Sequence, residues 1–274
     1  METCAAPQPK LPENLNDKAF VDALEKRIFR GVGQAIGDFN LVSEGDRILV
    51  GVSGGKDSWT LLHVMNEMRK RAPVEYHLVA VNIDQGYPGF RQDLIADYLD
   101  IHQIPYHLES TTHAQIVDEK SNGAVPCSLC SRLRRGSLYG LAEKLGCNKI
   151  ALGHHLDDFI ETSLLNSFFI GRTGSMAVKL KAEDGKNTVI RPLVYVSEKD
   201  IVAYTKAKNF PVVCCACPLA CGTNEFTDHK RRMVKNLIND LETKIPQIRN
   251  SLIASLGNIH PSHMLDTKLW NFEG

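Results

Sequence analysis

Apolar residues follow two alternating patterns along the chain. In residues 18–39 they recur about every fourth position, which predicts a helix. Continuous apolar runs, which are typical of strands buried on both faces, occur in RILVGV, EYHLVAVNID, KIALGHH and TVIRPLVYV, and PYHLES is strand-like. Helical patterns separate these runs, as in FRQDLIADYLDIH, CSLCSRLRRGSLYGLAEKLGC, DDFIETSLLNSFFIG and SEKDIVAYTKAKNF.

Strands that alternate with helices predict an α/β fold, in which a parallel, Rossmann-like sheet carries helices on both faces. Residues 1–16 are polar and contain proline, so we predict a flexible tail there. We predict one α/β domain over residues 17–210, which includes the N-terminal helix. Residues 211–274 then form a small, cysteine-containing helical appendage.

The composition is that of a folded protein, and it does not indicate a particular binding partner. The chain has 274 residues, of which 43% are hydrophobic, enough for a packed core. Its 32 basic and 32 acidic residues give no net charge, but a local basic face is sufficient for nucleic-acid binding. We see neither a signal peptide nor an apolar run of about 18 residues, so we expect a cytoplasmic protein with no membrane partner.

A glycine-rich turn joins the first strand to the next helix. Such a turn presents unpaired backbone N–H groups to an anion, and glycine lets the anion approach closely. It is not a Walker A loop, because three residues separate Gly51 from Gly55 and an aspartate follows the lysine. We predict phosphate binding by the turn residues Ser53, Gly54, Gly55, Lys56, Asp57 and Ser58.

The string SGGKDS resembles the PP-loop of ATP pyrophosphatases, a family that adenylates substrates and releases pyrophosphate. By this resemblance, residues 80–84 line the adenosine site and Asp84 faces the nucleotide. A polar strand end is the alternative there. GHHLDD also resembles a family motif, and it would place Gly153, His154 and Asp158 where phosphate, Mg²⁺ or substrate is oriented. The alternative is a helix cap by Asp157 beside a solvated histidine pair.

Eight cysteines in a cytosolic chain point to metal binding or redox chemistry rather than to disulfides. Cys127 and Cys130 form a C-x-x-C pair at a predicted helix start, and four more cysteines cluster between residues 214 and 221. Four thiolates suit zinc, three suit an iron–sulfur cluster with one open iron, and a C-x-x-C pair alone suits a redox dithiol or persulfide carrier. Spacing does not separate these alternatives.

Several motifs together resemble the TtcA-type tRNA 2-thiocytidine synthetases. SGGKDS, CSLCSRLRRG, KIALGHHLDD, IRPL, CPLACGT and PSHMLDTKLWNF occur in that family's order, and the match covers most of residues 20–272. The resemblance implies ATP- and Mg²⁺-dependent replacement of the 2-oxygen of cytidine 32 in tRNA by sulfur. It also implies a [4Fe-4S] cluster held by three cysteines. Two would be Cys127 and Cys130, and the third Cys221, with Cys217 as the alternative because the late string is one residue longer than usual.

By the same resemblance, Lys56, Asp57 and Asp158 are the candidate catalytic residues. Lys56 would offset charge on the pyrophosphate, and Asp57 would bind Mg²⁺ or brace the lysine. We hypothesise that the open iron of the cluster carries sulfur supplied by a cysteine desulfurase. The resemblance also implies a homodimer.

Two runs of basic residues are candidate contacts for tRNA phosphates, and the alternative for each run is a solvated helix face. Aromatic residues make up 7% of the chain and show no clear platform for bases. The candidate RNA-binding residues are Arg132, Arg134, Arg135, Lys230, Arg231 and Arg232.

Three other functions remain open. The first is another PP-loop tRNA enzyme, of the lysidine or uridine-thiolating type. The second is a non-catalytic ATP-binding protein with structural zinc, and the third is a persulfide carrier that works without a cluster.

Overall fold

The structure is a computed structural model that describes residues 17–120, 127–182, 185–214, 216–217 and 229–272; of Cys127 it describes the backbone alone. The predicted tail, residues 1–16, lies outside these ranges. Contacts divide the chain into a first unit, residues 1–156 and 177–227, and a second unit, residues 157–176 and 228–274. The domain boundary that we place after residue 210 stays a prediction.

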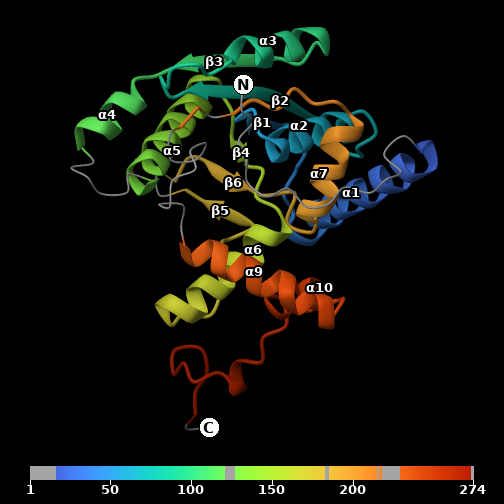
Figure 1. Ribbon diagram of the computed structural model, residues 1–274, viewed down its shortest axis with the longest axis vertical. Coiled ribbons are helices and arrows are strands. Elements are labelled where there is room, and N and C mark those ends of the chain that lie inside the picture. Colours follow the sequence, from blue (N-terminus) through green and yellow to red (C-terminus); the bar gives the residue numbers. More distant parts are fainter. Residues whose placement is uncertain (1–16, 121–126, 183–184, 215, 218–228, 273–274) are drawn as a thin grey trace. The chain divides into compact units, whose positions relative to one another are not determined.

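A six-stranded sheet forms the centre of the first unit, in the order β3-β2-β1-β4-β6-β5. The first five of these strands in spatial order pair in parallel, which confirms the predicted α/β sheet (Figure 1). The edge strand β5 is antiparallel to β6 and was not predicted, because its three exposed residues carry no strand pattern. The strands are β1 (Asp46–Gly51), β2 (Tyr76–Asp84), β3 (Tyr106–Ser110), β4 (Lys149–Ala151), β5 (Lys179–Lys181) and β6 (Thr188–Ile190).

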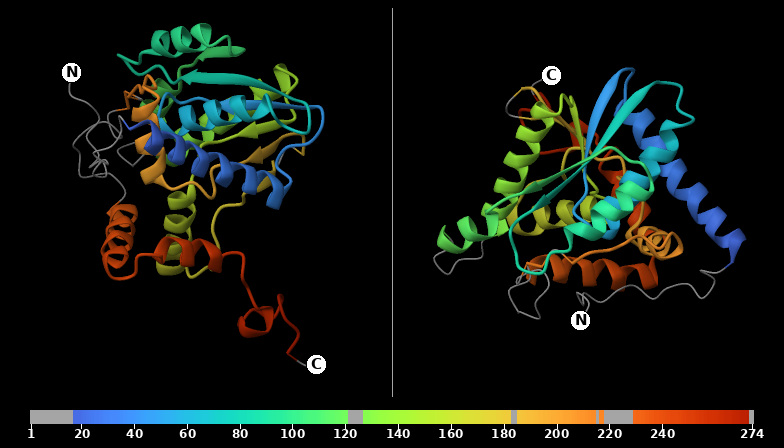
Figure 2. Two further views of the ribbon diagram at one scale, coloured as in Figure 1. Left: turned by 90° about the vertical axis from the view of Figure 1, so that its right-hand side faces the viewer. Right: turned by 90° about the horizontal axis from the view of Figure 1, so that it is seen from above.

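Helices cover both faces of this sheet, as predicted. On one face α2 (Lys56–Arg69) packs against both α1 (Lys18–Phe39) and α7 (Glu198–Ala207), which also contact each other. On the same face Trp59 of α2 contacts Tyr98 of α3 (Gln92–Ile101). The other face carries α5 (Cys127–Lys144), against which α4 (His113–Lys120) packs. Figure 2 shows α5, in yellow-green, and α1, in blue, on opposite sides of the strands.

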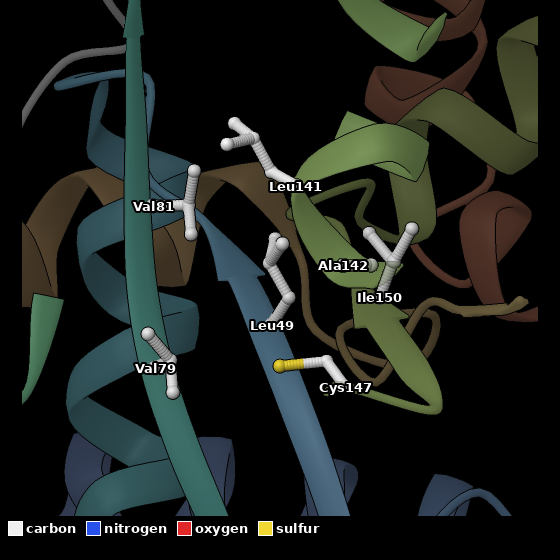
Figure 3. Close-up of a cluster of buried hydrophobic side chains, with 7 residues drawn as sticks. All are labelled: Leu49, Val79, Val81, Leu141, Ala142, Cys147 and Ile150. Carbon is white, nitrogen blue, oxygen red and sulfur yellow. The ribbon is translucent and has the colours of Figure 1, made fainter. Parts of the chain in front are cut away.

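The packing of α5 explains why the central strands are apolar throughout (Figure 3). A buried cluster joins the strand residues Leu49, Val79, Val81 and Ile150 to Leu141, Ala142 and Cys147. The alternate residues of β1, Ile48 and Val50, point to the opposite face and are fully buried too. Strand β1 is therefore enclosed on both faces, and the thiol of Cys147 is a core side chain.

Two predicted elements differ from those in the structure. DDFIETSLLNSFFIG does not form one regular helix: α6 (Leu156–Leu165) gives way to a π-helical turn, η1 (Asn166–Ile170). The strand predicted over TVIRPLVYV is only Thr188–Ile190, since Pro192 has no N–H to continue a ladder.

Helices form the described part of the second unit, as expected for the appendage. After α6 and η1 come α9 (His229–Lys244), α10 (Ile248–Ser255) and the short η2 (Pro261–His263). Within the described residues, no helix is both long and apolar enough to cross a bilayer.

Candidate active site

The turn between β1 and α2 is tied together by its own serines. Ser53 Oγ accepts a hydrogen bond from the Gly55 N–H at 3.4 Å and donates to Ser58 Oγ at 3.3 Å. Ser58 Oγ in turn donates to the Gly55 carbonyl at 2.8 Å. Gly54 has a φ of +85°, and a Cβ there would lie 2.8 Å from Val213 Cγ2. Glycine is therefore required at this position for both conformation and space.

The N-terminus of α2 has no side-chain cap. Helix α7, by contrast, is capped by Ser197, whose Oγ accepts from the Asp200 N–H at 3.2 Å. The first-turn N–H groups of α2 are thus left without a capping side chain, at the carboxyl edge of the sheet. Such groups bind an anion, helped by the positive end of the helix dipole.

Lys56 lies in the first turn of α2 between two carboxylates. Its Nζ is 3.1 Å from Asp57 Oδ1 and 3.4 Å from Glu198 Oε1. Burial lowers the pKa of Lys56, but the two carboxylates outweigh burial and the net pKa is raised. Lys56 therefore remains a cation at neutral pH. Glu198 was not a predicted site residue, because only the folded chain brings it to Lys56.

The GHH segment after β4 packs directly on this turn. A Cβ on Gly153 would meet the Asp57 carbonyl carbon at 3.0 Å, so only glycine allows this approach. His155 Nε2 lies 3.6 Å from Asp57 Oδ1. Asp57 Oδ1 is buried, yet it accepts no well-aligned hydrogen bond from the residues that the structure describes. A buried carboxylate oxygen with unused acceptor capacity, beside the predicted phosphate-binding turn, has the chemistry of a Mg²⁺ ligand.

His154 contacts a residue to which we had given no role. Arg191 Nε donates to His154 Nδ1 at 3.2 Å, and Arg191 Nη1 donates to the Ala177 carbonyl at 2.5 Å. Burial and the nearby charge of Arg135 lower the pKa of Arg191. The signal in the sequence was the IRPL string, which supported the family resemblance but did not indicate this contact.

Asp84 ends β2 and shapes the loop that follows it. Its Oδ1 accepts from the Gly86 N–H at 2.8 Å. Gly86 has a φ of +85°, and a Cβ there would lie 2.7 Å from the Thr111 carbonyl oxygen. The carboxylate thus supports a tight turn, and its predicted contact with the nucleotide stays a prediction.

This loop reaches two of the candidate cysteines. Cys130 Sγ donates to Gln85 Oε1 at 2.8 Å. Tyr87 interacts with both Cys130 and Cys217, and burial together with these two thiols raises its pKa. The fold therefore brings the C-x-x-C helix and the downstream cysteine segment to the same tyrosine. Gln85 and Tyr87 were not predicted, since only the folded loop brings them to the cysteines.

Two of the predicted cluster ligands fall partly or wholly outside the described residues. Cys127 begins α5, but its side chain lies outside them, as does the whole of Cys221. No group of three candidate metal ligands occurs among the side chains that are described. Cys214 is disulfide-bonded, which differs from our expectation that the cysteines serve metals or redox chemistry alone.

In the second unit, the aspartates of GHHLDD form ion pairs with arginines. Buried Asp157 pairs with Arg249 through a short contact. Asp158 lies 3.4 Å from Arg231, which is also 3.3 Å from Glu161. These contacts hold α6 against α9 and α10. The predicted catalytic role of Asp158 and the predicted RNA contact of Arg231 stay predictions.

The remaining candidate RNA-binding residues are exposed. Within the first unit they lie on α5, and within the second they lie at the start of α9. Their positions leave them accessible to phosphate groups. They are Arg132, Arg134 and Arg135 in the first unit and Lys230 and Arg232 in the second.

Comparisons with known proteins agree with this geometry. The profile of the PP-loop domain family matches residues 24–239. The chain is 54% identical over 252 residues to the tRNA-cytidine(32) 2-sulfurtransferase of Geobacter sulfurreducens, covering 91% of this chain and 96% of that one. It is 49% identical over 254 residues to the protein of the same name from Syntrophotalea carbinolica, with the same coverage.

Among solved structures, the chain resembles the U34-tRNA thiolase NcsA from Methanococcus maripaludis, which was solved with its [4Fe-4S] cluster. The TM-score is 0.68 at 21% identity, over 88% of this chain and 81% of that one. This likeness shows a shared fold.

Proposed function

We propose that this chain, which belongs to the PP-loop family of tRNA-cytidine(32) 2-sulfurtransferases, uses ATP to replace an oxygen of a tRNA cytidine with sulfur. The observation that carries the proposal is the 54% identity to the Geobacter sulfurreducens enzyme across nearly the whole chain. The uncapped helix beside Lys56 supplies the anion site that such a reaction needs.

The first step is adenylation, which converts the O2 atom of cytosine from a poor leaving group into a good one. The O2 atom of the cytosine ring attacks the α-phosphate of ATP, and pyrophosphate leaves. The first-turn N–H groups of α2, together with Ser53, Ser58 and Lys56, hold the departing pyrophosphate. Because Lys56 stays charged at neutral pH, it offsets the negative charge that grows on the leaving group. A sulfur nucleophile then attacks C2, and AMP departs with the original oxygen.

A magnesium ion fits beside this turn. Asp57 Oδ1 has unused acceptor capacity among the described residues, and a carboxylate oxygen next to nucleotide phosphates is a usual Mg²⁺ ligand. Asp57 thus has two roles in the proposal, since it also accepts from Lys56 Nζ at 3.2 Å. Gly153 and His154 complete the phosphate-facing edge, and Asp84 supports the loop beside the adenosine site.

The cysteines fit an iron–sulfur cluster. Cys130 and Cys217 both interact with Tyr87, which supports a cluster with ligands from the C-x-x-C helix and the downstream segment. Cys127 and Cys130 would be two ligands, with Cys221 or Cys217 as the third. When bound, a [4Fe-4S] cluster with three thiolate ligands supplies one iron that is open to an exogenous sulfur ligand.

Several parts of the proposal concern the cell. A cysteine desulfurase would supply the sulfur, the enzyme would work as a homodimer, and both would lie in the cytoplasm with tRNA. The basic residues of α5 and the start of α9 would contact the phosphates of that tRNA.

Nucleoside analysis tests the reaction directly. Protein purified without oxygen is incubated with ATP, Mg²⁺, sulfide and a tRNA transcript, and the digested nucleosides are identified by mass spectrometry. We expect 2-thiocytidine, and none from a matched transcript with uridine in place of cytidine 32. Thiolated uridine, or no thiolated base in iron-loaded protein, would show that the proposed substrate is wrong.

A metal analysis of the same protein tests the cluster. We expect about four irons and four acid-labile sulfides per chain, lost in Cys130→Ala. Stoichiometric zinc in protein that still thiolates tRNA would rule out the cluster and favour a persulfide on the same ATP-binding core.

A further inference from the structure

Three consecutive apolar side chains are exposed in η1, the π-helical turn that follows α6. Phe168 is 52% exposed, Phe169 is 40% exposed and Ile170 is 67% exposed. π-helical turns are rare and occur often at functional sites. A contiguous exposed apolar patch with aromatic rings is also a frequent sign of a binding surface.

One cation lies over one of these rings within the second unit, and another follows them closely in the sequence. Lys230, at the start of α9, places its Nζ 4.9 Å from the centre of the Phe169 ring. Arg172 is exposed two residues after η1. Arg231, the next residue after Lys230, is instead ion-paired with Asp158 and Glu161. Figure 1 shows η1, in yellow, beside the beginning of α9. We call Phe168, Phe169, Arg172 and Lys230 the η1 surface.

Exposed aromatic rings together with cations favour single-stranded RNA over a protein partner. A second copy of the chain joined through a two-fold axis would place the η1 surface, whose two charged residues are both cations, against itself, and like charges repel. Single-stranded RNA complements both features, because its bases stack on aromatic rings while its phosphates attract the cations. An acidic protein segment would satisfy the charges without requiring planar rings.

We propose that the η1 surface binds unpaired nucleotides of the tRNA anticodon loop, with bases stacked on Phe168 and Phe169. This inference rests on the proposed function, in which the enzyme acts on a loop cytidine. An enzyme that modifies a base must take it out of its stack, and the neighbouring bases then lose stacking energy. The two phenylalanines replace that lost stacking, and Lys230 and Arg172 contact the adjoining phosphates.

Binding of a fluorescent anticodon stem–loop RNA tests this proposal by anisotropy. Phe168→Leu keeps an apolar side chain but removes the ring, whereas Phe168→Tyr keeps the ring. We expect the leucine variant to bind about tenfold more weakly and the tyrosine variant to bind as the wild type does. Phe169→Leu and Phe169→Tyr should have the same effects on RNA binding as the corresponding changes at Phe168. Lys230→Ala should reduce the slope of log affinity against log salt by about one, while the phenylalanine changes leave that slope intact.

Controls separate recognition from folding. Ile101, an exposed apolar residue of the first unit, supplies Ile101→Ala as a matched variant that should bind RNA normally. Urea unfolding and sedimentation velocity monitor stability and oligomeric state in every variant. Wild-type affinity in Phe168→Leu and Phe169→Leu would overturn the proposal, as would a change of oligomeric state with RNA affinity intact.

The proposed function is judged separately, by 2-thiocytidine formation in the wild type. If wild-type protein thiolates tRNA and the leucine variants bind RNA normally, only the η1 inference fails. If wild-type protein neither binds nor thiolates tRNA, the proposed function itself fails.

Discussion

Two lysine–aspartate pairs lie at opposite ends of the same sheet, and their surroundings differ. At the amino ends of β1 and β4, Lys149 Nζ is 2.6 Å from Asp46 Oδ2 and donates to the Leu41 carbonyl at 2.9 Å. Asp46 also accepts from the Ser43 N–H at 2.6 Å and from Asn148 Nδ2 at 2.7 Å. Both side chains are less than a tenth exposed.

At the carboxyl end, the contacts of Lys56 and Asp57 are longer and less complete. Their side chains are 29% and 32% exposed, and the lysine divides its charge between Asp57 and Glu198. Asp57 Oδ1 keeps unused acceptor capacity among the described residues. An ion pair alone therefore does not indicate function. A pair with all its hydrogen bonds made stabilises the fold, while a partly satisfied pair is prepared for a ligand.

Breaking the buried pair should give the largest effect. Lys149→Ala leaves Asp46 as a buried, uncompensated charge, and we expect the free energy of unfolding to fall by about 3–5 kcal/mol. This free energy is measured by urea denaturation, with unfolding monitored by circular dichroism. The double variant Asp46→Leu with Lys149→Met should recover most of the loss, because apolar replacement of both partners removes the unpaired charge. A loss under about 1 kcal/mol would place this pair in the same class as a surface salt bridge.

Removing the other lysine should affect the reaction instead of the fold. Lys56→Ala should lower kcat for tRNA thiolation by about 10²–10³-fold, since it deletes a cation that offsets charge in the transition state. The free energy of unfolding should change by at most about 1 kcal/mol, because the pair is partly exposed. Steady-state kinetics and urea denaturation are run on the same preparation. A stable but fully active Lys56→Ala protein would contradict the proposed role.

A change in the glycine turn should moderately weaken both the stability of the fold and the binding of ATP. Gly54→Ala introduces a Cβ that would lie 2.8 Å from Val213 Cγ2, at a residue whose φ is +85°. We therefore expect the free energy of unfolding to fall by about 1–3 kcal/mol and ATP to bind more weakly. Gly140→Ala in α5 is the matched control, since a Cβ there meets nothing within 4 Å. That control should be neutral or slightly stabilising. Equal losses in both variants would argue against a special conformation at Gly54.

The smallest expected effect is a pH dependence of stability. Burial raises the pKa of Asp46, but hydrogen bonds from Lys149, Asn148 and Ser43 outweigh burial and lower it below its ordinary value of 3.8. The stabilisation is therefore complete above the unfolded-state pKa and is lost as the pH falls through the folded-state pKa. Urea midpoints at pH 6, 4 and 3 should fall more in the wild type than in the Asp46→Leu, Lys149→Met double variant. Parallel declines would contradict this assignment.

The pattern of apolar residues was sufficient to predict the central strands of the sheet and the helices that cover them. The continuous run of β1 predicted burial on both faces, and Leu49 and Ile48 are indeed enclosed on opposite faces. Gly146 follows the end of α5 at Lys144 and has a φ of +65°, a conformation that favours glycine after a helix. The π-helical turn η1 escaped prediction because its apolar residues continue the helical pattern of α6, although their side chains are exposed.

Local spacing indicated the part of the candidate site whose residues are close in the sequence, whereas the distant residues, such as Asp84 and His154, were indicated by the family resemblance. The turn from Ser53 to Ser58 forms one local motif, and its position between strand β1 and helix α2 follows from the local sequence alone. Glu198, Gln85 and Tyr87 reach their partners through the tertiary fold, so no local spacing indicates them. The meeting of Cys130 and Cys217 at Tyr87 depends on the fold in the same way.

The most direct test of the central claim is to measure the products of ATP and tRNA in one reaction. We expect pyrophosphate, AMP and 2-thiocytidine to form in equal amounts. All three should require the tRNA, and Lys56→Ala should lower them together. Release of ADP and phosphate, or thiolation that proceeds without cleavage of ATP, would contradict an adenylating reaction at the turn between β1 and α2.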